Sequence, residues 1–300
     1  MDMTQNKCCR HGANLRRRRR RRRKILRSVI FSCSIIAVAV FVAVGSRMIT
    51  SGDGGTNKYD VEAGKNTYDN AVIENSKISE KNKIQNNQSM LDDIMNSTQY
   101  PKQLKDLALK NEEALEFVYD YPTEHVKEHT IDLTEEASMD SVPLFVQWDK
   151  RWGYEKYSGN FFAASGCGPT TLSMVVVYLT HNREASPIAV AKYSKEAGYS
   201  VDGSGSSWTL ISEGCRHYGV KAKTVALDES RMKAELDAGH PIVINVGPGD
   251  FTDTGHFMVI TGYDDEGFSI NDPNSIEKSG KRWLFKNISS QIRAVWSMYV

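Results

Sequence analysis

One cysteine stands where a helix is expected to begin, and a cysteine there can act as a nucleophile. Residues 166–179 read Gly-Cys-Gly-Pro-Thr-Thr-Leu-Ser-Met-Val-Val-Val-Tyr-Leu. Pro169 suits a first helical turn, because its missing N–H needs no partner there. Unpaired N–H groups and the helix dipole at that end favour a thiolate at Cys167, and flanking glycines would let a substrate backbone approach. One face of this helix would carry Leu172, Val175, Val176 and Leu179.

Cys167 has a purely structural alternative. Only Cys215 accompanies it after residue 46, and a disulfide between the two would be stable in an oxidising compartment. A buried, unreactive thiol is the other structural interpretation. The residues around position 167 do not by themselves decide between a nucleophilic and a structural role for Cys167.

A predicted hairpin supplies a base for this thiol. Residues 255–263 read as a strand, 264–267 as a turn, and 268–272 as a returning strand stopped by Pro273. His256 and Asp272 then lie near facing positions at the open end, where a carboxylate can hold an imidazole N–H. Asn271 points to the opposite face by strand alternation, so we expect Asp272 to orient His256. A half-buried structural histidine is the alternative.

The N-terminus is strongly basic and precedes an apolar stretch. Residues 1–27 carry 12 positive charges and one negative charge, so the other 273 residues sum to −10 in a chain of net charge +1. Residues 28–46 are 19 uncharged positions, enough for a helix to cross a bilayer core of about 30 Å. Basic residues before the stretch and only Arg47 after it predict a cytoplasmic N-terminus and an extracellular remainder.

We therefore expect a single-pass cell-membrane protein with an uncleaved signal-anchor over 28–46. Arg16–Arg23 would contact anionic lipid headgroups. A cleaved signal peptide, which would release a secreted protein, is the alternative, and Ala43-Val44-Gly45 would suit cleavage. A nucleic-acid patch is disfavoured because the basic run adjoins the apolar stretch.

The remaining chain divides by composition. Residues 47–100 are rich in Asn, Lys, Ser and Gly and predict a disordered spacer. Residues 101–141 predict a helical pre-segment, with an amphipathic helix over 101–119 that ends before Tyr121-Pro122. This helix would serve as a clamp on the domain or as a brake on its cleft. Residues 142–300 have the composition of one packed domain, and the overall 40% apolar and 25% charged residues exclude fibrous and wholly disordered classes.

Four motifs together resemble a known family. They look like the bacteriocin-processing-peptidase-like cysteine peptidases, in their stand-alone, surface-located bacterial branch rather than the domain fused to an exporter. The similarity spans about 142–300. The motifs are Gln147-Trp148-Asp149-Lys150-Arg151-Trp152-Gly153, Gly166-Cys167-Gly168-Pro169-Thr170, Gly255-His256-Phe257-Met258-Val259 and Asn271-Asp272-Pro273-Asn274.

The resemblance implies an α+β, papain-like fold with the cysteine-bearing helix packed on an antiparallel sheet. It implies Cys167 as nucleophile, His256 as base and Asp272 as the residue that orients the base. Gln147 would help form the oxyanion hole, although its 20-residue spacing to Cys167 is longer than in the exporter-fused members. A strand residue facing solvent is the alternative for Gln147. Asp149, Arg151 and Trp152 are expected to be structural, as an ion pair and a core side chain.

Other chemistry is not indicated. His125-Val126-Lys127-Glu128-His129 matches a zinc-peptidase pattern but lies in a polar stretch without the amphipathic helix that such a site needs. We expect no cofactor, no metal and no nucleic-acid partner. The expected function is a membrane-anchored, monomeric extracellular cysteine peptidase acting on peptides or proteins. The alternatives are a cell-wall peptide hydrolase or amidase with the same triad, and an idle peptide-binding module with Cys167 in a disulfide.

Overall fold

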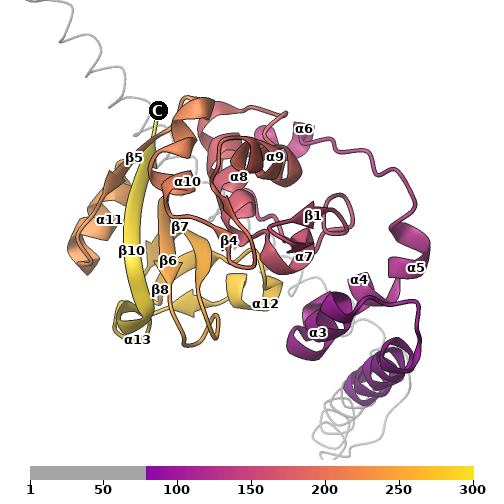
Figure 1. Ribbon diagram of the computed structural model, residues 1–300. Helices are drawn as coiled ribbons and strands as arrows, with labels where there is room; N and C mark the ends of the chain where they lie inside the picture. The colour runs from indigo at the N-terminus through magenta and orange to yellow at the C-terminus, as the bar shows by residue number, and fades with distance from the viewer. Residues whose placement is uncertain (1–78) are drawn as a thin grey trace, which may run out of the picture. The chain divides into compact units, whose positions relative to one another are not determined.

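The computed structural model describes residues 79–300, which belong to one compact unit. A six-stranded sheet of order β5-β10-β6-β7-β8-β9 runs through it, and every neighbouring pair of strands is antiparallel (Figure 1). The predicted mixture of helices and an antiparallel sheet is therefore confirmed. The strands are β5 (Lys221–Thr224), β6 (Ile242–Val246), β7 (His256–Asp264), β8 (Gly267–Asn271), β9 (Arg282–Trp283) and β10 (Ile292–Tyr299).

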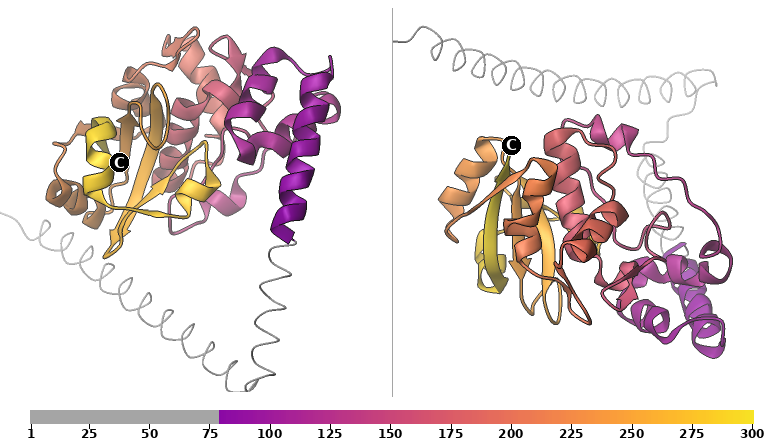
Figure 2. Two further views of the ribbon diagram at one scale, coloured as in Figure 1. Left: turned by 90° about the horizontal axis from the view of Figure 1, so that it is seen from below. Right: turned by 45° about the horizontal axis from the view of Figure 1, so that its top comes forward.

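Helices cover both faces of this sheet (Figures 1 and 2). Val243 on β6 and Val259 on β7 belong to the core shared with α8, whereas Ile244 and Met258 belong to the core on the α11 side. This alternation follows from the two-residue period of a strand. The helices of the two faces are α8 (Cys167–Thr180), α9 (Pro187–Glu196), α10 (Thr209–Ser212) and η2 (Gly214–Tyr218) on one side, and α11 (Glu229–Asp237), α13 (Phe285–Ile288) and η3 (Ser289–Gln291) on the other.

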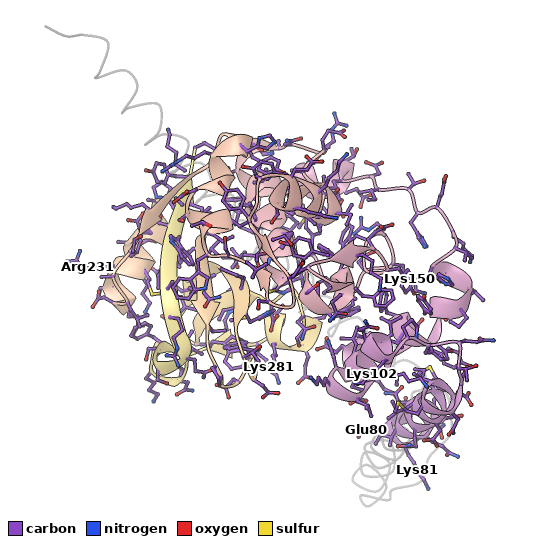
Figure 3. The ribbon with its side chains drawn as sticks, in the orientation of Figure 1. Glu80, Lys81, Lys102, Lys150, Arg231 and Lys281 are labelled. Atoms are coloured by element: carbon purple, nitrogen blue, oxygen red, sulfur yellow. The ribbon has the colours of Figure 1, made fainter. Side chains whose placement is uncertain are left out.

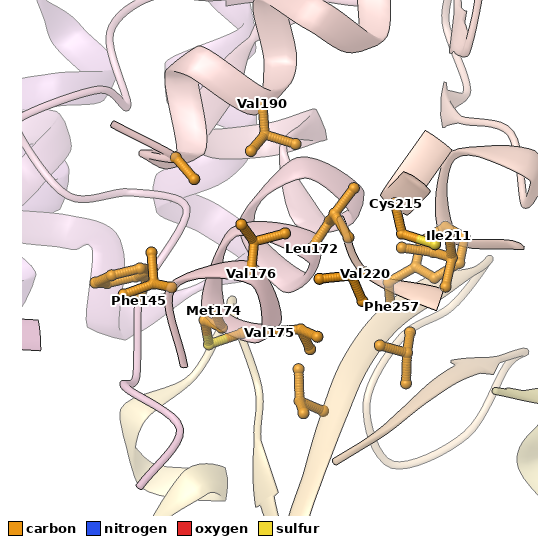
Figure 4. Packing of buried hydrophobic residues seen from close by; sticks show 14 of the residues in the cluster. Phe145, Leu172, Met174, Val175, Val176, Val190, Ile211, Cys215, Val220 and Phe257 are labelled. Carbon is orange, nitrogen blue, oxygen red and sulfur yellow. The ribbon is translucent and has the colours of Figure 1, made fainter. Parts of the chain in front are cut away.

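Helix α8 is more deeply buried than the sequence predicted. Ten consecutive residues, from Gly168 to Val177, are buried, so the helix is enclosed on all sides instead of on one face. Figure 4 shows Leu172 and Val175 among side chains from α9, α10 and β7. A helix with apolar side chains on every side suits this central position. Its first residue is Cys167, and its C-cap is His181 in the left-handed conformation.

The predicted hairpin is confirmed as β7 and β8. The register pairs Val259 with Asn271 and Ile260 with Ile270, and it shifts by one residue between Ile260 and Gly262. Asp264 and Gly267 form the last pair, so Asp265 and Glu266 make the turn.

The segment before the sheet differs from the expected spacer and helix. Residues 79–96 are helical and bury Ile94, so the spacer predicted over 47–100 is wrong for this part; its remainder up to residue 78 lies outside the described residues. The predicted 101–119 helix is interrupted. Asn111 takes an extended conformation and caps the next turn. The resulting pieces are α3 (Lys102–Lys110), η1 (Glu112–Ala114) and α4 (Leu115–Tyr119), followed by α5 (Tyr121–Glu124) and α6 (Thr134–Ala137).

Helices α3 and α4 pack on the domain through their own core. Leu104, Phe117 and Val118 contact a cluster that includes Phe161 and Ala163. Charged side chains such as Lys102 occupy the outer surface (Figure 3). The connections to the sheet are β1 (Lys156–Tyr157), β2 (Asn160–Phe161), α7 (Phe162–Ser165), β3 (Ser200–Val201), β4 (Gly205–Ser206) and α12 (Ile276–Ser279).

No helix within residues 79–300 is long and apolar enough to cross a membrane. The predicted anchor over 28–46 and the basic run Arg16–Arg23 lie outside the described residues.

Candidate active site

Cys167 is held at the first turn of α8, against the strand that begins with His256. Its side chain is partly exposed, whereas the rest of the helix start is buried. Thr171, one turn along α8, donates its hydroxyl to the carbonyl of Phe257 at 3.0 Å. This bond ties the start of α8 to the start of β7. Cys167 and His256 are thereby placed side by side, near enough for each side chain to shift the pKa of the other.

His256 contacts Asp272 on its other side. Its Nε2 atom lies 2.7 Å from Oδ1 of Asp272, and both side chains are buried. An Nε2–H donated to the carboxylate leaves Nδ1 for the thiol. Asn271 turns away and donates to the carbonyls of Val142 and Pro143 at 3.2 and 3.0 Å. The structure thus brings together the three residues that the sequence singled out, with Asp272 and not Asn271 beside the imidazole.

The three side chains favour a charged thiolate and imidazolium. Burial raises the pKa of Cys167, but the hydrogen bond and charge of His256 outweigh it, and the pKa of the thiol is lowered. Burial likewise lowers the pKa of His256, but the negative charge of Asp272 and the contact with Cys167 raise it to about 10. An opposite charge within a few ångströms stabilises the ionised form of each partner. Such a pair is the reactive state of a cysteine nucleophile.

Cys215 has the opposite environment. Both thiols of the described residues are free, which contradicts the disulfide alternative for Cys167. Cys215 lies in the core near Ile211 (Figure 4), and this burial raises the pKa of its thiol to about 11. A neutral thiol in apolar surroundings is unreactive. Of these two cysteines, only Cys167 is placed to act as a nucleophile.

Gln147 lines the same cleft as Cys167 and His256. It lies in a turn with 4% of its surface exposed, so the alternative of a strand residue facing solvent is wrong. Its Nε2 donates to the carbonyl of Ala163 at 2.7 Å, and its backbone N–H donates to Pro273 at 2.7 Å. The amide has two N–H donors, and the bond to Ala163 uses one of them.

The glycines beside Cys167 serve internal packing. A Cβ at Gly168 would meet Oγ of Ser206 at 2.5 Å, and a Cβ at Gly166 would meet the ring of Phe162 at 2.6 Å. Both glycines are buried, so the expectation that they admit a substrate backbone is wrong. They allow the cysteine-bearing turn to sit close to α7 and β4.

Two hollows meet at Cys167. One, of about 520 Å³, is bordered by α3, the loop 249–255 and Asn274; the other, of about 680 Å³, is bordered by residues 203–206, Gly247-Pro248 and Trp208. They share five lining residues, so the thiol faces a cleft open in two directions. An extended peptide could lie across the thiol with residues on both sides. The shared residues are Asn160, Ala164, Cys167, Thr254 and Gly255.

Two walls of this cleft lie outside the motifs that predicted the site. The loop 249–255, Gly-Asp-Phe-Thr-Asp-Thr-Gly, connects two strands, and loops held by a rigid scaffold are where functional residues concentrate. The α3 wall includes Gln103, Lys110 and Asn111. Nothing in the local sequence of α3 indicates that it borders a site more than 50 residues away.

The remaining motifs have structural surroundings. Arg151 pairs with Asp149 at 2.9 Å, and Trp152 is 1% exposed, which confirms their expected structural roles. His125 and His129 follow the four-residue helix α5 and lie in a turn and a loop, so they do not share the helical face that the zinc-peptidase pattern requires.

Comparisons with known proteins identify the family of this chain. A family model described as the Peptidase_C39 like family matches residues 139–300, and no curated protein matches the chain. The peptidase domain of Streptococcus ComA, a bi-functional ABC transporter involved in a quorum-sensing pathway, is 19% identical over 45% of this chain and 90% of that chain, with a TM-score of 0.36. A protein from Bacillus anthracis described as a C39-like peptidase is 17% identical over 53% of this chain and 95% of that chain, with a TM-score of 0.34. Since the family model covers more than half of the 300 residues, this chain belongs to the Peptidase_C39 like family.

Proposed function

We propose that this protein is a cysteine peptidase that hydrolyses peptide bonds through an acyl-enzyme. The observation that carries the proposal is the contact of a partly exposed cysteine thiol with a histidine that is itself held by a buried aspartate. This arrangement activates a thiol and supplies the proton that a leaving amine needs. Membership in a peptidase-like family supports the same conclusion.

In this mechanism the Cys167 thiolate attacks the carbonyl carbon of a peptide bond. The imidazolium of His256 gives its proton to the leaving nitrogen, and the amine departs as the thioester forms. Neutral His256 then takes a proton from water, whose oxygen attacks the thioester. The acid product leaves, and the proton on His256 restores the ion pair. Asp272 keeps Nε2 protonated and the ring oriented throughout.

Gln147 is proposed as an oxyanion donor together with the backbone N–H of Cys167. The N–H groups of a first helical turn have no intrahelical partner, so that of Cys167 is available to a ligand. Two observations support this role for Gln147. Its side chain is buried in the wall of the cleft, and its amide has a second N–H that the bond to Ala163 does not use. Donors fixed in this way stabilise charge that develops in the transition state.

The location is proposed from the sequence. We propose that residues 28–46 anchor the protein in the cell membrane with the catalytic domain outside, and that Arg16–Arg23 contact anionic headgroups on the cytoplasmic side. Protease treatment of intact cells tests this arrangement. Digestion of the C-terminal domain, with the N-terminus protected and retained in the membrane fraction, is the expected result.

A peptide-library assay tests the activity. The full-length protein in detergent would be incubated with unstructured peptides and, separately, with purified cell wall, and products identified by mass spectrometry. Cys167→Ala should abolish hydrolysis, whereas Cys215→Ala should not. Cleavage of wall alone would assign wall cross-bridges as the substrate class. Undiminished hydrolysis by Cys167→Ala would contradict the proposal.

A further inference from the structure

The turn that carries Asp272 is held by residues far earlier in the chain. Asn111 donates through Nδ2 to the carbonyl of Asn274 at 2.9 Å and to its Oδ1 at 3.0 Å. The backbone N–H of Asn274 donates to Oδ1 of Asp272 at 2.8 Å, the same oxygen that contacts His256. A continuous set of hydrogen bonds therefore runs from Asn111 to the imidazole.

Glu113 holds the next part of the same turn. Its Oε2 accepts from the backbone N–H groups of Ile276 at 2.7 Å and Glu277 at 3.0 Å, and its Oε1 accepts from the hydroxyl of Ser275. Hydrogen bonds to a carboxylate are stronger than those between neutral groups. These three bonds fix the start of α12, three to five residues after Asp272.

Asn111 and Glu113 act as one unit. The Oδ1 atom of Asn111 accepts from the backbone N–H of Glu113 at 3.0 Å, which sets the turn between α3 and η1. Both residues precede residue 139, where the family match begins. The same segment borders the cleft through Gln103 and Lys110. It therefore contacts both the cleft and the turn after β8.

We infer that Asn111 and Glu113 are positioning residues for the His256–Asp272 pair. They restrain the 272–277 turn so that Oδ1 of Asp272 stays aimed at Nε2 of His256. The inference rests on the proposed function. Gln147 and Trp148 also contact this turn, through Pro273 and Asn274. The alternative hypothesis is therefore that residues 147–148 hold the turn without Asn111 and Glu113.

Loss of these contacts should change the reactivity of the Cys167 thiol as well as substrate turnover. Asp272 and Cys167 are the ionisable side chains that act on His256. If the aspartate is held less firmly, the imidazolium is less stable, and the Cys167 thiolate forms at higher pH. Reaction with iodoacetamide reports thiolate content directly and needs no substrate.

The test compares Asn111→Asp and Glu113→Gln with wild type in the full-length protein. Asn111→Asp keeps the acceptor for Glu113 and removes the donor to Asn274. We expect Cys167 alkylation on the acidic limb of its pH profile to slow on the order of tenfold, with little change at a pH where the thiolate is fully formed. The matched control is Glu112→Gln, because Glu112 accepts from Asn87 at 2.7 Å and not from the turn. It should leave the profile unchanged.

Several results would overturn the inference. Profiles of both variants that match wild type would show that residues 147–148 suffice. An equal slowing at every pH would indicate altered access to the thiol instead of altered positioning.

Near-UV circular dichroism identifies a variant that fails to fold. In that case Asn274→Ala, which removes only the side-chain acceptor, tests the same contact. A wild-type Cys167 that reacts as an ordinary thiol would instead contradict the proposed function.

Discussion

The imidazole of His256 and the carboxylate of Asp272 meet at 2.7 Å although the register does not place them directly opposite each other. Because Val259 pairs with Asn271, Asp272 lies beyond the paired part of β8, and its side chain reaches back diagonally to the start of β7. The turn after β8, more than the sheet itself, sets this contact.

Asp272→Asn removes the charge that stabilises the imidazolium. We expect kcat/KM for peptide hydrolysis to fall by about 10²-fold or more, with the larger loss at acidic pH, where the thiolate depends most on its partner. The matched control is Asp265→Asn, an exposed carboxylate in the turn of the same hairpin. Equal effects of the two substitutions would contradict the role of Asp272.

The pH dependence of hydrolysis should be bell-shaped and wide. The pKa of Cys167 is lowered, so activity should appear on the acidic side of 9.0, the ordinary value for a thiol. The pKa of His256 is raised to about 10, so the imidazolium should persist through neutral pH and activity should decline only near that value. A rise centred at 9.0 or above, or a decline near 6.5, would refute the ion pair.

Gln147→Ala removes the proposed side-chain oxyanion donor. We expect kcat to fall by roughly 10²- to 10³-fold with a much smaller change in KM, because the oxyanion exists only in the transition state. Loss of the bond to Ala163 should also lower the free energy of unfolding by about 1–3 kcal/mol. Thermal denaturation separates this effect from catalysis, and Gln88→Ala, on the exposed surface of the 79–96 helix, is the control.

Leu104→Ala tests whether the pre-segment is part of the folded domain. Leu104 is fully buried in the core that joins α3 and α4 to Phe161, so its truncation should lower the free energy of unfolding by about 2–5 kcal/mol. Leu109→Ala is the control, because Leu109 lies on the same helix with 57% of its surface exposed. Urea unfolding followed by tryptophan fluorescence measures both. If Leu104→Ala lowers the free energy of unfolding no more than Leu109→Ala does, α3 packs only loosely on the domain.

Local patterns predicted the parts of the site that lie on regular elements. The α8 start at Cys167 followed from Pro169 and the apolar run, and strand alternation predicted that Asp272 and not Asn271 lies on the same face as His256. These features depend on residues close together in sequence. The family followed from the four combined motifs within residues 142–300, and the family model matches residues 139–300.

The contacts of the pre-segment could not be predicted in this way. Asn111 and Asn274 are 163 residues apart, and neither helix period nor strand alternation links them. At the helical interruption, Asn111 bonds to that distant residue as well as to the local turn. The sequence does not predict the helix over 79–96, because this stretch is polar and only one of its residues, Ile94, is buried.

The reactivity of Cys167 with iodoacetamide as a function of pH tests the central claim most directly. Mass spectrometry without reductant follows Cys167, with the buried Cys215 as an internal control and His256→Ala as the paired variant. The thiolate–imidazolium pair predicts rapid labelling of Cys167 well below pH 9.0, strong slowing in His256→Ala, and an unlabelled Cys215 in the folded protein. Labelling of Cys167 that rises only near pH 9.0 and is the same in His256→Ala would contradict the account.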